Sequence, residues 1–152
     1  MNVQEVLEKI LNGVAIVTSK MDNKINGLSV AWITQVSFQP PLVAVSIGKT
    51  KYTHEMIKNS KVFAVSILYE GQVDVAKHFG LRSGKEIDKF LNIPYETKIT
   101  GAPILKDCLA YIDCKLEASF DIGDHTIFVG KILDAGIKQN KKPLIYNPKD
   151  YW

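Results

Sequence analysis

The sequence predicts a mainly β fold, a closed or nearly closed antiparallel barrel that carries a few short helices. The strongest signal lies in residues 112–122, where apolar and polar side chains alternate over eleven residues. A period of two is typical of a strand with one buried face. The turn 123–125, Gly-Asp-His, leads into a second strand, 126–133, which continues toward Ile137. A long antiparallel pair flanked by several short strands favours a barrel over a parallel sheet.

The chain begins with a predicted helix and a hairpin. Residues 3–12 carry apolar side chains at helical spacing, and Gly13 ends that run. A short β-branched strand follows at 14–19. The turn 21–24 joins it to a second strand over 25–33, so we expect an antiparallel hairpin.

Two compact apolar segments, 42–47 and 62–68, predict two further strands. Between them Thr53 is placed to cap a short helix that runs through Asn59, with Glu55 in its first turn. Two more short helices are expected, at 73–79 and at 84–91.

The length and the composition of the chain indicate a single soluble domain over residues 1–152. The chain has 152 residues, of which 46% are hydrophobic and 23% charged. No apolar run approaches the roughly 20 residues that a membrane helix needs, and the first residues do not resemble a secretory signal, so we expect a cytoplasmic protein. The net charge of +3 is scattered along the chain. A nucleic-acid partner is therefore not expected.

Cys108 and Cys114 are expected to be free thiols. On one regular strand, six residues separate them by about 20 Å. A disulfide needs Cα atoms within about 7 Å. Buried thiols of this kind are consistent with a reducing compartment.

Several common sites are excluded. No GxGxxG follows a strand, and no GxSxG is present. The run 80–86 has its two glycines one residue too close for a P-loop, and Glu86 stands where Ser or Thr would hold magnesium. His54-Glu55 lacks the second histidine of a zinc-protease helix, and the chain has no four-ligand Cys/His cluster.

The segment 26–53 indicates a site for a planar ring with a phosphate tail. Small and hydroxyl-bearing residues, which let a backbone lie against a flat ligand, precede the Pro40-Pro41 break. They are Asn26, Gly27, Ser29, Ala31, Thr34 and Ser37. The strand 42–47 then ends in a loop, 48–53, that carries two lysines and several hydroxyls just before a helix, an arrangement suited to phosphate. The alternative is a solvated turn with Thr53 as an ordinary N-cap.

Taken in order, these segments resemble the flavin reductase-like family, the FMN-binding split-barrel proteins. The resemblance rests on the small-residue strand, the S-F-x-P-P-L-V pattern at 37–43, the apolar strand and the basic loop. The turn 123–125 with Val129-Gly130 is similar to that family's G-D-H turn and following strand. Lys89-Phe90 and residues 101–105 fall in the family's usual order, so the resemblance extends from about Leu11 to Tyr146.

The resemblance implies a homodimer of Greek-key split β-barrels with FMN bound near the subunit interface. The ring would lie against Ser29, Val30, Ala31, Trp32 and Thr34. Ser46 would flank the ribityl chain, and Gly48, Lys49, Lys51, Tyr52 and Thr53 would surround the phosphate. His125 matches a histidine that lies near the flavin and nicotinamide in related reductases. Tyr52 and the paired lysines replace the Arg and Ser often seen in this loop, which leaves FAD open as an alternative.

The implied activity is hydride transfer from NADH or NADPH to flavin, with electrons passed to free flavin, ferric iron or a partner protein. Without a Rossmann motif, the nicotinamide would stack directly on the flavin. The first alternative is an electron-transfer flavoprotein that holds FMN tightly without NAD(P)H activity. The second is a split-barrel module that binds haem or another ring.

Individual residues have simpler interpretations as well. Trp32 is either a ring contact or a core residue. His125 is either a proton or amide contact near the ring or an incidental exposed side chain. The aromatic residues Tyr146, Tyr151 and Trp152 either dock on the barrel or the partner subunit, or form a frayed end.

Overall fold

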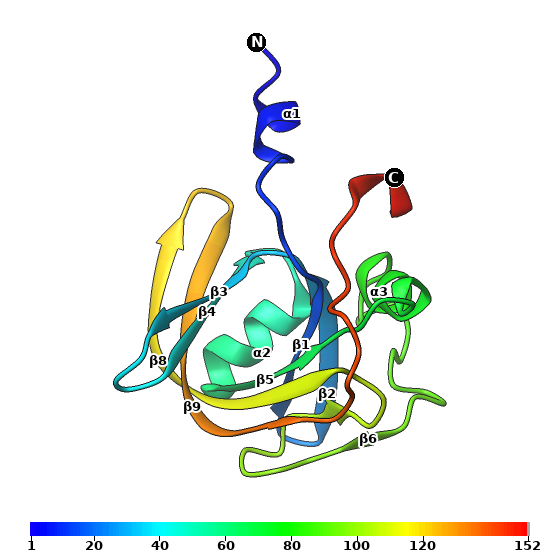
Figure 1. The fold of residues 1–152 in the computed structure, drawn as a ribbon. Helices are drawn as coiled ribbons and strands as arrows, with labels where there is room; N and C mark the ends of the chain where they lie inside the picture. Colours follow the sequence, from blue (N-terminus) through cyan, green and yellow to red (C-terminus); the bar gives the residue numbers. More distant parts are fainter. Residues whose placement is uncertain (152) are drawn as a thin grey trace.

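One seven-stranded antiparallel sheet dominates the computed structural model, which describes residues 1–151 (Figure 1). Its strand order is β2-β1-β5-β8-β9-β4-β3, and a two-stranded sheet, β6-β7, lies beside it. The strands are β1 (Ala15–Met21), β2 (Lys24–Val30), β3 (Ile33–Ser37), β4 (Leu42–Gly48), β5 (Val62–Ile67), β6 (Tyr95–Glu96), β7 (Ile104–Leu105), β8 (Ala110–Ile122) and β9 (His125–Ile137). The helices are α1 (Val3–Leu7), α2 (Tyr52–Ser60), α3 (Val73–Gly80) and a 3-10 turn, η1 (Pro148–Asp150).

The mainly β class is confirmed, but a closed barrel is not what the strands form. In residues 1–151 the large sheet is open, and its two edges are β2 and β3. Residues 31–32 redirect the chain after β2, so that β3 pairs with β4. The sheet nevertheless curls strongly and surrounds α2 (Figure 1).

The main core lies between the curled sheet and α2. It is built from the β-branched and aromatic residues that the short apolar strands supply, and each such side chain contributes about 1.5–3 kcal/mol when it is fully buried. Val17, Val45, Ile57, Val65, Phe63 and Phe128 belong to this cluster. A Cβ at Gly130 would lie 2.5 Å from the Phe63 ring, so glycine is needed where β9 passes this ring.

A second apolar cluster joins α3 to the other face of β1. It contains Ile16, Leu68, Phe79, Phe90 and Cys108. Cys108 and Cys114 are both buried and free, as predicted. Burial raises the pKa of the Cys114 thiol to about 12, so this sulfur is an inert core group.

The long hairpin β8–β9 confirms the predicted pair, but the predicted continuous buried face is wrong. The register shifts between Asp113 and Cys114 and again between Leu116 and Ala118. Beyond these bulges Phe120 is 58% exposed and Ile122 is 61% exposed. The far end of the hairpin therefore presents apolar side chains to solvent.

The helices follow the predictions in part. The helix expected at 73–79 is α3, whereas the one expected at 3–12 is only α1. The helix expected at 84–91 is a series of turns, because the Lys89 side chain is drawn inward and Asp88 caps the Phe90 N–H locally. The helix expected from Thr53 is α2, but its N-cap residue is Lys51 and Thr53 lies inside the helix.

Candidate functional site

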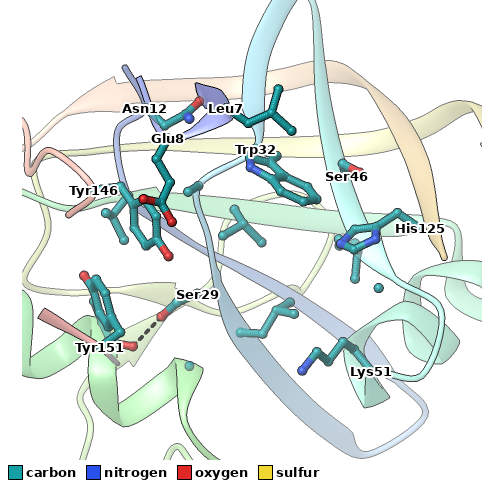
Figure 2. Close-up of a pocket in the computed structure, with 18 of the residues that line it drawn as sticks. Leu7, Glu8, Asn12, Ser29, Trp32, Ser46, Lys51, His125, Tyr146 and Tyr151 are labelled. Atoms are coloured by element: carbon teal, nitrogen blue, oxygen red, sulfur yellow. Dashed lines mark hydrogen bonds between the residues drawn. The ribbon is translucent and has the colours of Figure 1, made fainter. Parts of the chain in front are cut away.

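A pocket of about 350 Å³ opens where β2 ends, beside β4 and α3 (Figure 2). We call it the apolar pocket. Figure 2 shows Trp32 and His125 at one end and Tyr146 and Tyr151 at the other. The remaining lining residues are Gln4, Leu7, Glu8, Ile10, Asn12, Val14, Leu28, Ser29, Val30, Ala31, Ser46, Ile47, Gly48, Lys51, Ala76, Gly80 and Leu81.

Backbone and side-chain hydrogen bonds fix the wall formed by residues 29–32. The Ser29 hydroxyl donates to the Ala76 carbonyl at 2.5 Å, which ties the end of β2 to α3. The Ser46 N–H donates to the Trp32 carbonyl at 3.0 Å, which ties the following turn to β4. The wall is therefore a short stretch of small side chains and backbone that ends in an indole, a surface suited to a flat ligand.

His125 stands beside Trp32 with its ring oriented by its neighbour. The two ring centroids are 4.8 Å apart at an interplanar angle of 45°. His125 Nδ1 lies 2.6 Å from Asp124 Oδ1, and this contact lowers the pKa of the Asp124 carboxyl. Because a carboxylate only accepts, Nδ1 carries the proton of this pair. In the neutral ring, Nε2 is then the free acceptor.

A second pocket of about 260 Å³ adjoins the first. We call it the polar pocket. Its cations are Lys51, Arg82 and Lys89, and Glu86 lies at its rim. Its other lining residues are Asn26, Leu28, Ser29, Thr50, Tyr52, Thr53, Phe79, Gly80, Leu81, Ser83 and Gly84. Five residues line both pockets, so the two form one continuous site: they are Leu28, Ser29, Lys51, Gly80 and Leu81.

Lys89 is the most unusual group in the polar pocket. Its residue is only 4% exposed, and its ammonium donates to the Gly27 carbonyl at 2.9 Å and to the Phe79 carbonyl at 2.8 Å. Burial, and next the charge of Lys51, lowers the pKa of Lys89 from 10.5 to about 8. A buried cation held by two neutral carbonyls retains its attraction for an anion in the same pocket.

Asn26 and Thr53 build the floor of the polar pocket. The Asn26 amide donates to the Thr53 hydroxyl at 2.9 Å, and both residues are buried. This bond joins β2 to the first turn of α2. The same turn brings the N-terminal end of α2, with its unpaired N–H groups, to the pocket.

Most of the site residues predicted from the sequence meet in this double pocket. Those in the apolar pocket are Ser29, Val30, Ala31, Trp32, Ser46, Gly48, Lys51 and His125. Tyr52 and Thr53 line the polar pocket. Two predicted residues lie outside both pockets. Thr34 is exposed on the edge strand β3 with its hydroxyl on the Gln35 carbonyl, and Lys49 is exposed in the loop after β4.

The sequence interpretation missed several lining residues. Arg82 and Ser83 belong to the run 80–86, which was not assigned to any site from the sequence, yet they line the polar pocket. Of Arg82, Ser83 and Lys89, only Lys89 carried a signal in the sequence, as part of the Lys-Phe pair in the family order. Tyr146 and Tyr151 stack at 5.4 Å and 16° and form a wall of the apolar pocket, so they dock on the sheet rather than fray. Trp152 lies outside the described residues.

Two other kinds of site can be assessed over residues 1–151. This part of the chain contains no cluster of three or more His, Cys, Asp or Glu side chains that could bind a metal ion. None of its helices has the length and apolar character needed to cross a membrane.

The fold and the double pocket define a class of β-sheet protein that takes a planar ring with an anionic tail. The chain belongs to the flavin reductase like domain family, which residues 7–152 match.

Relatives support this membership over most of the chain. The ferric-chelate reductase (NAD(P)H) of Archaeoglobus fulgidus is 33% identical over 144 residues, which cover 93% of this chain and 85% of that protein. The high molecular weight rubredoxin of Moorella thermoacetica is 35% identical, and the match covers 93% of this chain but only 63% of that longer protein. The structure of a Streptomyces globisporus NADH:FAD oxidoreductase in complex with NAD and FAD fragments superposes with a TM-score of 0.88 at 29% identity, over 95% of this chain and 86% of that one.

Proposed function

We propose that this chain is an NAD(P)H-dependent flavin reductase that binds FMN across the double pocket. The observation that supports this most strongly is that the apolar pocket is continuous with the cationic polar pocket. The two pockets match the two chemical halves of FMN, the flat ring and the phosphate. The similarity to the Archaeoglobus ferric-chelate reductase (NAD(P)H) and the Streptomyces NADH:FAD oxidoreductase supports the same class of reaction. FAD stays an alternative, because the Arg82 side chain, which lines the polar pocket, is 61% exposed and leaves room for a longer tail on its solvent side.

The apolar pocket suits the isoalloxazine ring. Residues 29–31 would lie against the ring, Trp32 would border one edge, and Ser46 would flank the ribityl chain. The flavin, when bound, supplies hydride acceptance and onward electron transfer. The protein positions it and keeps one side accessible to a nicotinamide.

The polar pocket suits the phosphate. Lys51, Lys89 and Arg82 supply cationic donors, and the first turn of α2 supplies N–H groups. Hydrogen bonds to charged groups contribute about 1.5–3 kcal/mol each, so two or three would dominate the affinity. Lys49 and Thr34, which lie outside both pockets, are not needed for this arrangement.

His125 is the residue proposed to act at the reacting end. Asp124 holds Nδ1, so Nε2 is available to hold a proton or to accept a hydrogen bond beside the ring. The position of His125 beside Trp32 in the lining of the apolar pocket supports this role.

We also propose a homodimer in which two open sheets form the Greek-key split barrels of the family. Apolar side chains are exposed along β3 and the far end of β8–β9, and a soluble monomer rarely exposes a large apolar patch. These are Trp32, Val36, Phe38, Phe120 and Ile122. Free flavin, ferric iron or a partner protein would then accept the electrons. The buried free thiols suit the reducing cytoplasm, which is the location we propose.

An anaerobic absorption experiment tests the proposal. The purified protein is loaded with FMN, and its visible spectrum is recorded before and after addition of NADH or NADPH. We expect bleaching of the flavin band faster than with FMN and nicotinamide alone. Retention of FMN without faster bleaching would replace the reductase with the electron-transfer flavoprotein, and a Soret band would point to a haem-binding module.

A further inference from the structure

A three-residue hydrogen-bonded chain lies directly behind His125. Thr126, the next residue on β9, is 2% exposed. Its Oγ1 is 2.8 Å from Asp121 Oδ1 on β8 and 2.7 Å from His54 Nε2 on α2. The chain therefore joins the tip of the β8–β9 hairpin to the helix whose first turn lines the polar pocket.

The proton positions in this chain follow from simple counting. The carboxylate of Asp121 accepts, so the single hydroxyl hydrogen of Thr126 points to Asp121. Thr126 Oγ1 can then only accept from His54, which requires a proton on Nε2. His54 is thereby assigned as the donor.

His54 acts from the face opposite to the pocket. Successive side chains of a strand point to opposite faces, so Thr126 points toward α2 while His125 points to the pocket. In the described chain, His54 is not among the residues that line either pocket. Its half-buried ring instead packs edge-on against the core residue Phe128, with the ring centroids 5.0 Å apart at 62°.

We infer that His54 is a positioning residue, which holds the strand bearing His125 at a fixed place relative to the first turn of α2. The inference rests on the proposed reductase function, because it assigns His54 a role in that reaction through His125. His125 pairs with Gly48 and Thr126 with Ile47 in the β4–β9 ladder, so a shift of Thr126 moves His125 with it.

The surroundings favour a neutral His54 with its proton on Nε2. Burial is the main cause that lowers the pKa of His54, and the charges of Lys58 on α2 and Lys49 in the preceding loop act in the same direction. Asp121 on β8 opposes them. At neutral pH, the neutral Nε2–H tautomer can donate to Thr126 Oγ1, so the hydrogen-bonded chain needs no positive charge on His54.

The kinetic test compares His54→Ala with His54→Gln, whose amide N–H can replace the Nε2 donor. Lys58→Arg is the matched control, because it changes an exposed side chain one turn further along the same helix and keeps the charge that acts on His54. We expect His54→Ala to lower kcat for NADH oxidation roughly tenfold, the order of loss that a small misplacement of a reacting group produces. The FMN Kd should stay within about twofold, and His54→Gln should recover most of kcat.

Nuclear magnetic resonance tests the geometry without any activity. The ¹⁵N shifts of His54 in the wild-type apo protein should show the Nε2–H tautomer. The His125 ring signals should move in His54→Ala and stay in place in Lys58→Arg. Three results would each overturn the inference. The first is a wild-type His54 without a proton on Nε2, and the second is a His54→Ala variant in which both the His125 signal and kcat are unchanged. The third is a His54→Gln variant that is as impaired as His54→Ala. A wild-type protein that oxidises no nicotinamide, with the tautomer as expected, would refute the reductase function and with it the catalytic part of this role.

Discussion

The two ends of the double pocket are built in different ways. One wall of the apolar end is a contiguous stretch, 29–32, whose Trp32 is 54% exposed. The polar end is assembled from distant segments, and its Asn26, Thr53 and Lys89 are buried and hydrogen-bonded. Under the proposed function, ring binding would depend on shape at a half-open surface, whereas anion binding would depend on a preorganised buried network.

The largest predicted effect is on FMN affinity, and comparison with riboflavin distinguishes the polar end from the apolar end. Lys89→Met removes the buried cation but keeps the length and apolar character of the side chain. Two of the three ammonium hydrogens are held by the Gly27 and Phe79 carbonyls, so one is left for the phosphate. We expect the FMN Kd to rise roughly thirtyfold, because this charge-assisted bond is lost, while the Kd of riboflavin, which has no phosphate, changes less than about threefold. Fluorescence titration of apo protein with both ligands measures this. Equal losses for FMN and riboflavin would mean that Lys89 only supports the fold.

The second prediction uses pH on the wild-type protein. With its pKa lowered to about 8, Lys89 is charged below pH 8 and neutral above it in the ligand-free protein. A bound phosphate favours the charged form and raises this pKa, so binding takes up a proton above pH 8. FMN affinity should therefore be level from pH 7 to 8 and fall by up to about tenfold per pH unit above 8. Riboflavin affinity should stay level over this pH range, and Lys89→Met should abolish the pH dependence of FMN affinity. If the pH dependence survives in this variant, another titrating group causes it.

The third prediction concerns the apolar end. Trp32→Ala removes the indole that borders the proposed ring position and contacts His125. Because Trp32 is half-exposed, we expect a loss of about three- to tenfold that is the same for FMN and riboflavin, the size of one aromatic contact. The same titrations measure it. A loss confined to FMN would contradict the division of the site into two ends.

The smallest predicted effect falls on a lysine that the sequence placed at the phosphate. Lys49→Ala should change the FMN Kd by less than about twofold, because an exposed charge outside the pocket is screened by solvent. Lys51→Ala, two residues further along the same loop, is the matched comparison and should weaken FMN binding by about tenfold. If the two variants had equal effects, the loop would be acting only through its net charge.

The sequence could predict the apolar end because its signals are local. Residues 29–32 follow one another on the chain, and alternation and turn residues located most of the strands around them. The hairpin bulges at 113–114 and 116–118 could not be foreseen, since they depend on how β8 and β9 are paired and not on composition.

The polar end could be predicted from the sequence only in small part, because its residues come together through tertiary contacts. Lys89 looks like an ordinary surface lysine in the sequence, and its burial arises only when 84–91 packs beneath α3 and β2. The bond between Asn26 and Thr53 likewise joins residues that are distant along the chain. Propensity favoured a helix at 84–91 and an N-cap at Thr53, and tertiary hydrogen bonds overrode both.

The most direct measurement of the central claim is the ratio of riboflavin to FMN affinity in the wild-type apo protein at pH 7. The account predicts that FMN binds about a hundredfold more tightly, because the polar pocket contributes two or more charge-assisted hydrogen bonds to the phosphate. Equal affinities for the two ligands would contradict it, since the polar pocket would then hold no part of the flavin.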